Sequence, residues 1–279
     1  MLDYFGLFRF TTFTTKVQKN GHSALFRLIN YIFFRKFVPM FAFKQFTIQQ
    51  DRCAMKVGTD GVLLGAWARV EHCSHILDVG TGTGLIALMA AQRSEAHIIG
   101  IDLDADAVAQ ASENAAPSPW SHRIQMIEMD VRAMDGERLT AKDEENPPSF
   151  DAILCNPPYF ANSLKSPDAA RTMARHTDTL TFDELAHSAS RLLSPKGELS
   201  VVIPYDRATD MTVSAACFGL FTTRQTIICP VEGAKPKRIL MAFSREGAPH
   251  TPEFLCIQDA QRQYTPEYIR LVEDFYLKM

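Results

Sequence analysis

Cysteine motifs are missing from this 279-residue sequence. None of its six cysteines forms a C-x-x-C pair, and their spacing suits neither a zinc site nor a disulfide framework. The six are Cys53, Cys73, Cys155, Cys217, Cys229 and Cys256. We therefore expect reduced thiols in a cytoplasmic protein without a bound metal.

Long apolar runs are missing as well. No stretch reaches the roughly 18 uncharged apolar residues that a membrane-spanning helix needs, so we expect no membrane span. Near the N-terminus no small-residue cleavage site follows an apolar core, which argues against a secretory signal. A hydrophobic content of 46% and a charged content of 22% are typical of a soluble globular protein.

A net positive charge is also absent, because the formal total is −3. The charge is unevenly distributed: residues 1–39 hold six lysines and arginines against one aspartate, a net +5, which leaves −8 for residues 40–279. We predict a basic, aromatic N-terminal extension over residues 1–39 and one folded domain over residues 40–279. The sequence leaves three roles open for the extension: no fixed role, an RNA-binding arm, or a membrane-surface helix.

Strand-like and helix-like segments alternate from about residue 41 onward. Strands are predicted at residues 76–79, 98–102, 124–129, 150–155, 199–203, 222–229 and 239–244, and helices at 85–93, 105–114 and 182–193. Thr181 and Glu184 are predicted to form a capping box at the start of the last helix, and residues 195–197 a turn after it. This alternation predicts an α/β, Rossmann-like fold with a seven-stranded, mostly parallel sheet. The last two strands have no long helix between them, so we expect them to form an antiparallel hairpin at one edge.

A glycine-rich turn follows the first of these strands. Gly80, Gly82 and Gly84 are spaced G-x-G-x-G and open a helix, an arrangement that lets a nucleotide-like cofactor approach the backbone and the free N–H groups. A dinucleotide fingerprint would place its third glycine at position 85, which is Leu85. The spacing therefore argues against NAD and FAD.

Acidic residues stand where a cofactor pocket needs them. Asp102 ends the second strand, 22 residues after Gly80, where a carboxylate can accept both ribose hydroxyls or can cap the next helix. Asp78 precedes the glycines and is atypical of a dinucleotide turn. Thr59 lies before the first strand, either close to the cofactor or as the N-cap of the apolar run 62–67.

A second motif, Asn-Pro-Pro-Tyr at residues 156–159, follows the strand 150–155. The nitrogen of an amide or of an exocyclic base amine is a poor nucleophile, because its lone pair is delocalised. The side-chain oxygen of Asn156 and the carbonyl of Pro157 can accept its N–H groups, and Tyr159 offers a flat face to a flipped-out base. No general base is required early, since the amine becomes acidic as it is alkylated.

Together, the glycine turn and the Asn-Pro-Pro-Tyr motif resemble the amino-methylating S-adenosylmethionine enzymes of the class I methyltransferase fold. Within that group, the sequence is similar to the bacterial valine-tRNA adenine-N6 methyltransferases, which modify the adenosine next to the anticodon. The similarity covers about residues 41–279 and rests on residues 43–47, 51–61, 64–67, 78–84, 156–159, 174–176, 236–238 and 274–279. Residues 1–39 depart from it, because such proteins have a short basic start.

This resemblance implies S-adenosyl-L-methionine as the cofactor and tRNA as the partner. It places Asp78 near the methionine amino group and Asp130 at the adenine amino group. Residues implied in substrate binding are Phe160, Lys165, Arg171, Arg175, Lys235, Lys237 and Arg238. The motif alone does not identify the substrate, so a protein glutamine-N5 methyltransferase and an rRNA or DNA amino-methyltransferase stay open as alternatives.

Overall fold

The computed structural model describes residues 40–53, 55–134, 149–157 and 180–278. The chain divides into residues 1–39 and a compact unit of residues 40–279, and the structure concerns the second unit. The predicted N-terminal extension therefore lies outside the described residues. No described helix is long and apolar enough to span a bilayer.

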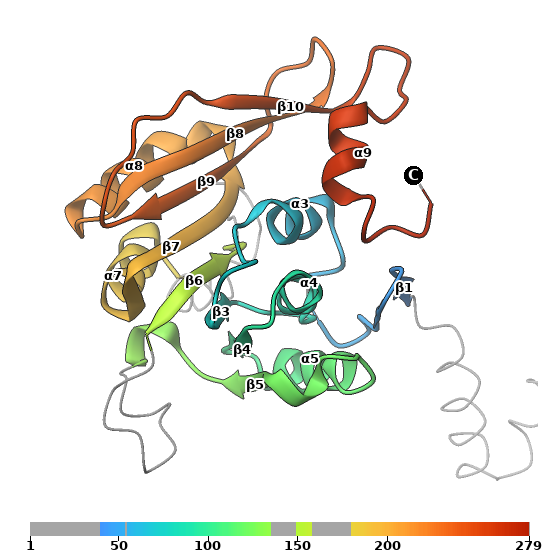
Figure 1. Cartoon of the computed structure of the whole chain (residues 1–279), viewed down its shortest axis with the longest axis vertical. Coiled ribbons are helices and arrows are strands. Elements are labelled where there is room, and N and C mark those ends of the chain that lie inside the picture. The colour runs from blue at the N-terminus through green and yellow to red at the C-terminus, as the bar shows by residue number, and fades with distance from the viewer. Residues whose placement is uncertain (1–39, 54, 135–148, 158–179, 279) are drawn as a thin grey trace, which may run out of the picture. The chain divides into compact units, whose positions relative to one another are not determined.

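One large sheet organises this unit (Figure 1). Its order is β10-β8-β9-β7-β6-β3-β4-β5, and only β9 runs antiparallel to its neighbours. The strands are β3 (His75–Val79), β4 (His97–Asp102), β5 (Ile124–Glu128), β6 (Phe150–Cys155), β7 (Leu193–Pro204), β8 (Phe221–Val231), β9 (Arg238–Ser244) and β10 (Glu253–Gln258). The α/β fold with a mostly parallel sheet is thereby confirmed.

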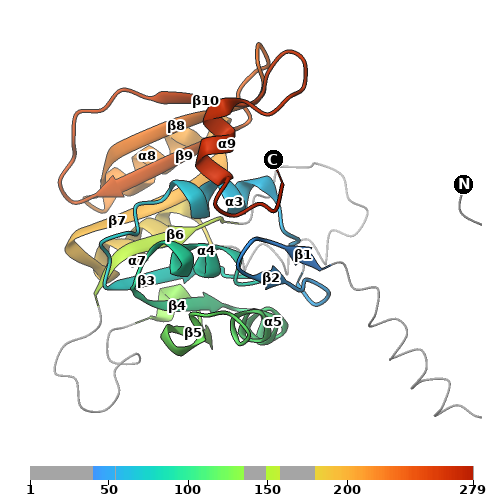
Figure 2. The same cartoon turned by 45° about the vertical axis from the view of Figure 1, so that its right-hand side comes forward.

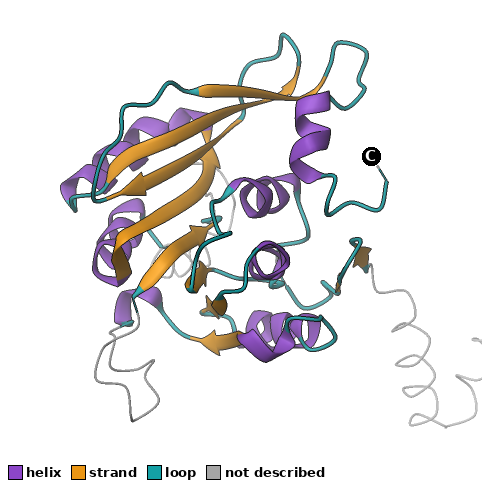
Figure 3. Cartoon of the chain, in the orientation of Figure 1, coloured by secondary structure: helices purple, strands orange, loops and turns teal. Residues whose placement is uncertain are grey.

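Helices cover both faces of the sheet (Figures 1 and 3). One face packs against α3 (Thr59–Trp67), α4 (Leu85–Arg93) and α9 (Pro266–Val272), and the other against α7 (Phe182–Leu192) and α8 (Ala208–Cys217). Residues from both faces are buried, for example Leu77 toward one apolar cluster and Ile76 toward the other. Such two-sided burial explains why β3 and β6 read as continuous apolar runs.

The sheet differs from the prediction at one edge. An eighth strand, β10, pairs in parallel with β8, so the antiparallel pair β8–β9 lies inside the sheet and not at its edge. Leu255 of β10 is 7% exposed, whereas its neighbour Phe254 is 71% exposed. Edge pairing satisfies the backbone groups of β8 while burying only one side chain firmly, which leaves a weak strand signal in the sequence.

The join between α7 and β7 also differs. Residues 195–197 read as a turn, yet they belong to β7, where the register shifts from Phe150↔Leu193 to Ala152↔Glu198. The extra residues bulge out of the ladder, so the strand begins earlier than predicted. The predicted capping box at the start of α7 is confirmed: Thr181 and Glu184 exchange side-chain to backbone hydrogen bonds.

A small structure precedes α3 (Figure 2). The strands β1 (Phe41–Ala42) and β2 (Thr47–Ile48) pair with each other, and the rings of Phe43 and Phe46 stack with centroids 4.7 Å apart. Phe43 forms a bridge to Tyr276, and the backbone N–H of Lys44 donates to the carbonyl of Phe275 at 2.8 Å. The C-terminal segment thus holds the start of the compact unit in place.

Candidate functional site

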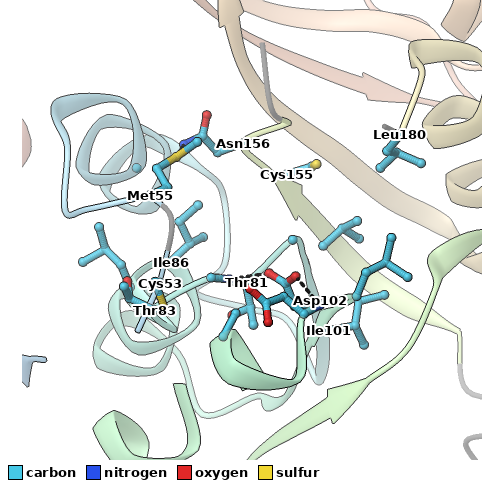
Figure 4. A pocket seen from close by; sticks show the side chains of 18 of the residues that line it. Cys53, Met55, Thr81, Thr83, Ile86, Ile101, Asp102, Cys155, Asn156 and Leu180 are labelled. Carbon is cyan, nitrogen blue, oxygen red and sulfur yellow. Dashed lines mark hydrogen bonds between the residues drawn. The ribbon is translucent and has the colours of Figure 1, made fainter. Parts of the chain in front are cut away.

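A cavity of about 750 Å³ opens at the carboxyl ends of β3, β4, β5 and β6 (Figure 4). The volume is in the ordinary range for a cofactor site. Parallel α/β sheets bind ligands at this edge, because the loops after neighbouring strands meet there. Its walls come from the glycine turn, the ends of β4, β5 and β6, and the chain before α3.

The glycine turn forms the floor of the cavity. All three predicted glycines have left-handed backbone conformations, with φ of 70° at Gly80, 53° at Gly82 and 80° at Gly84. A Cβ at Gly80 would meet no atom within 4 Å, so backbone there is open toward a ligand. A Cβ at Gly84 would lie 3.2 Å from the Cβ of Ala111, so this glycine is needed for packing against α5 (Ala105–Ala115).

Asp102 stands at the cavity wall and is held by the glycine turn. Its Oδ2 accepts the N–H of Gly82 at 2.9 Å, and its Oδ1 accepts the N–H of Asp104 at 3.1 Å. The helix-cap alternative for Asp102 is wrong, because Asp104 caps α5 through the N–H of Asp106. Ionised carboxylates accept about four hydrogen bonds, which leaves acceptor capacity for two ribose hydroxyls. Leu103, 50% exposed, adds an apolar wall beside it.

Asp78 lies behind the glycine turn and not among the residues that line the cavity. It is fully buried; its Oδ2 accepts the hydroxyl of Thr81 at 2.6 Å and the N–H of Ala87 at 3.1 Å, while Oδ1 has no hydrogen-bond partner among the described residues. Burial raises the pKa of this carboxyl to about 7. In the structure, Asp78 shapes the turn from the rear.

Asp130 lines the cavity as one half of an ion pair. Both of its oxygens accept Nε of Arg132 at 2.9 Å, and Arg132 also reaches Glu184 at 3.2 Å. The hydrogen bonds from Arg132 lower the pKa of Asp130. Sequence reasoning missed Arg132, although an arginine two residues after a strand-end acid is a readable signal.

The described residues 49–53 and 55–58 form the front wall, and we call them the strap. Its residues Cys53, Met55 and Lys56 line the cavity. Asn114 of α5, only 2% exposed, accepts the N–H of Gln49 and donates to its carbonyl, both at 2.8 Å.

The same Asn114 also ties the strap to the glycine turn. Its Nδ2 donates to the carbonyl of Thr83 at 2.9 Å. Gln110, on the same helix and fully buried, accepts the N–H of Arg52 at 3.2 Å. No sequence signal identified Asn114 or Gln110, because their partners are 31 to 65 residues away.

Thr59 follows the strap as the first residue of α3 and lines the cavity. The N-cap of α3 is Gly58, and no side chain caps the helix. The alternative interpretation of Thr59 as the N-cap is therefore wrong. Its position at the wall is the one expected of a residue close to a ligand.

Asn156 reaches the cavity from the end of β6 (Figure 4). It is half-buried, and its Nδ2 lies 3.7 Å from the sulfur of Met55 in the strap. The following Pro157 is buried. Other residues predicted to contact the substrate lie outside the described residues: Tyr159, Phe160, Lys165, Arg171 and Arg175.

The predicted basic cluster between β8 and β9 is only partly at the cavity. Nε of Arg238 donates to Oδ2 of Asp60 at 2.7 Å, and both residues line the wall. Lys235 and Lys237 are exposed and lie outside the wall. At the cavity mouth the charges of Arg238 and Asp60 therefore offset each other, and the exposed Lys235 and Lys237 add positive charge in the same connection.

The lining suits a ligand with a nucleoside. Exposed glycine backbone, the Asp102 carboxylate and apolar side chains such as Leu103 and Met129 are gathered in one cavity. Among the described residues there is no group of three or more histidine, cysteine, aspartate or glutamate side chains that could hold a metal ion. The glycine backbone, the carboxylate and the apolar side chains that line the cavity fit an organic cofactor.

Comparisons with known proteins place this chain in a family. Residues 76–197 match the family described as "Methyltransferase domain". A tRNA1(Val) (adenine(37)-N6)-methyltransferase from Phocaeicola vulgatus is 50% identical over 241 residues, which cover 86% of this chain and 99% of the relative. One from Tolumonas auensis is 43% identical, covering 86% of this chain and 97% of the relative.

A solved structure supports the fold. A predicted O-methyltransferase from Agrobacterium tumefaciens aligns with a TM-score of 0.54 and 20% identity over 77% of this chain and 96% of its own. At that identity only the fold is shared. The relatives carry the family assignment, and the resemblance inferred from the sequence motifs is confirmed. The chain belongs to the tRNA1(Val) (adenine(37)-N6)-methyltransferase family.

Proposed function

We propose that this enzyme transfers a methyl group from S-adenosyl-L-methionine to N6 of adenosine 37 in tRNA1(Val). The observation that carries the proposal is the position of Asn156 at the end of β6, on the wall of a nucleoside-sized cavity. The substrate comes from the names of the relatives, which match 86% of this chain at 43–50% identity.

The cofactor would occupy the cavity with its ribose at Asp102 and its base between apolar side chains. Asp102 is preoriented by the N–H of Gly82, so its carboxylate keeps its direction without a ligand. Leu103 and Met129 offer apolar surface to the adenine. When bound, S-adenosylmethionine supplies an electrophilic methyl group on a sulfonium.

Asn156 and Pro157 would bind the adenine amine. The side-chain oxygen of Asn156 and the carbonyl of Pro157 accept the two N–H groups, which turns the nitrogen lone pair toward the methyl group. Transfer would form the N–C bond as the S–C bond breaks and leave the sulfur as a neutral thioether, and the methylated amine would release its proton to solvent. Catalysis of this kind rests on positioning, because the leaving group is already good.

Tyr159 and Phe160 would hold the flipped base, and tRNA phosphates would contact basic residues at the cavity mouth. Among the described residues, the exposed Lys235 and Lys237 suit this role better than Arg238, whose guanidinium is paired with Asp60. Lys165, Arg171 and Arg175 stay predictions for the same role. Phosphate contacts position the RNA without reading its sequence.

Replacing Asn156 with alanine tests the proposal. We expect loss of methyl transfer to tRNA by at least about 100-fold with nearly unchanged cofactor affinity, measured by mass spectrometry of digested tRNA and by calorimetry. Gln125→Ala is the matched control, since Gln125 is an exposed amide on β5 outside the cavity. Normal turnover by N156A would refute the mechanism. Methylation of a protein glutamine in place of tRNA would keep the site and change the substrate.

A further inference from the structure

An exposed tyrosine follows the end of β7, next to the connection that leads to the cavity-lining Arg238, and the chemistry above does not use it. Tyr205 directly follows the last residue of β7 and is 41% exposed. Within the described residues its ring stacks on no other aromatic ring, unlike the pairs Tyr264–Tyr268 and Phe43–Tyr276. Single exposed aromatic residues are common, so the argument rests on where this one lies.

The backbone fixes Tyr205 beside the basic connection between β8 and β9. The last register pair of β6 and β7 is Cys155↔Val201, after which β7 continues to Pro204, the partner of Arg238. The N–H of Tyr205 then donates to the carbonyl of Lys237 at 3.2 Å. Tyr205 is thus one step beyond the pair that contains the cavity-lining Arg238.

The distance to the chemical site can be worked out from the register. Asn156 follows Cys155 and is level with Val202, so Tyr205 lies three residues further along and one strand across. A rise of about 3.3 Å per residue and a strand spacing of about 4.8 Å put the two backbones about 11 Å apart. At about 3.4 Å per stacked nucleotide, this spans about three nucleotides.

The charge around Tyr205 is uneven. Lys235 and Lys237 are exposed in the connection that the N–H of Tyr205 contacts. In the residues that follow Tyr205 along the chain, Asp206 is exposed, and Arg207 is engaged by Asp210 at 2.6 Å and lies 5.1 Å over the ring of Phe182. A phosphate backbone passing Tyr205 would therefore run along the two lysines and not along Asp206.

We propose that Tyr205 stacks on an unpaired base within about three nucleotides of the target adenosine, while Lys235 and Lys237 contact the phosphates of that RNA. The inference rests on the proposed function and extends it. Unpaired loop bases are recognised by stacking on aromatic side chains, and such stacking tolerates any base. Tyr205 would hold the anticodon loop in place while the adenosine is turned into the cavity.

Three variants test the tyrosine: Tyr205→Ala, Tyr205→Phe and Tyr264→Ala. Tyr264 is the matched control, since it is 48% exposed but its ring lies against Tyr268, next to β10 and far along the sheet order from β6. We expect Y205A to weaken binding of an anticodon stem-loop by roughly 5- to 100-fold, measured by fluorescence anisotropy. The loss should raise KM and leave kcat nearly unchanged, whereas Y205F and Y264A should behave like the wild type.

A second pair of variants tests the lysines. Lys237→Ala should lower the slope of log affinity against log salt by about 1, because one phosphate contact is lost. Lys196→Ala is the control, since Lys196 is exposed near the start of β7, at the opposite end of that strand from Tyr205 and Lys237. An unchanged salt slope in K237A would remove the phosphate contact from the proposal.

A base analogue gives a readout that altered folding cannot imitate. With 2-aminopurine placed in turn at the three nucleotides on each side of the target, binding to the wild type should quench one position, and Y205A should not. Wild-type binding without quenching at any position, or Y205A with wild-type affinity, would overturn the inference alone. A wild type that neither binds nor methylates the RNA would overturn the proposed function as well.

Discussion

Asn114 gives the sharpest test of how the cavity is built. Its buried amide makes three hydrogen bonds. It accepts the N–H of Gln49 in the strap, and it donates to the carbonyls of Gln49 and of Thr83 in the glycine turn. Asn114→Ala removes all three and leaves buried backbone groups without partners. At about 1 kcal/mol for each bond, with further cost for unpaired groups, we expect a loss of about 2–4 kcal/mol in the free energy of unfolding.

Asn114→Asp separates hydrogen bonding from side-chain shape. Aspartate keeps the acceptor for the Gln49 N–H but places a carboxylate against the carbonyls of Gln49 and Thr83, to which Asn114 now donates. Burial and these carbonyls would raise the folded-state pKa of the new carboxyl. Stability is then fully present below the unfolded pKa of about 4 and is lost as pH rises through the higher folded value. N114D should therefore be more damaging at pH 8 than at pH 5.

Urea denaturation at both pH values measures these effects, with Ser112→Ala as the control. Ser112 lies on the same helix and is exposed, and its side-chain hydroxyl donates to the carbonyl of Val108 within that helix. Loosening the strap should also weaken S-adenosylmethionine binding, since Met55 and Lys56 line the cavity. The reasoning fails if N114A stays within about 0.5 kcal/mol of S112A and binds the cofactor normally.

Two further changes have clear expected outcomes. Because burial raises the folded pKa of Asp78 to about 7 from 3.8, its contribution to stability is full below about pH 4 and is lost as pH rises to about 7. Asp78→Asn should remove that loss. The free energy of unfolding of D78N, measured relative to that of the wild type, should therefore be higher at pH 8 than at pH 4. An equal difference at the two pH values would contradict the assignment. A variant that starts at Met40 should unfold at the temperature of the full chain, because the described core begins there; aggregation of this variant would show that the boundary at residue 40 is wrong.

Features that depend on local sequence could be predicted. The glycine turn, the buried strands β3, β4 and β6 and the capping box at Thr181 each depend on a few neighbouring residues, so their patterns are visible without a structure. The order of the motifs then indicates which loops share a sheet edge. That was enough to bring Asp102 and Asn156 to one cavity.

Features that depend on distant partners could not be predicted. Asp78 reads as a ligand-binding acid, but its burial behind the turn follows from packing of α4 against β3. The ion pair of Arg238 with Asp60 joins residues 178 apart and removes a positive charge expected for RNA. The strand β10 is stabilised mainly by the edge of β8, a surface that no local pattern reveals.

The bridge between Phe43 and Tyr276 affects how the protein can be made. During synthesis the strap is made first and the glycine turn soon after, but Phe275 and Tyr276, which fasten the front of the unit, follow the strap by more than two hundred residues. Until then the ring of Phe43 lacks its contact with the ring of Tyr276. The front of the compact unit can therefore be fastened only after Phe275 and Tyr276 have been synthesised.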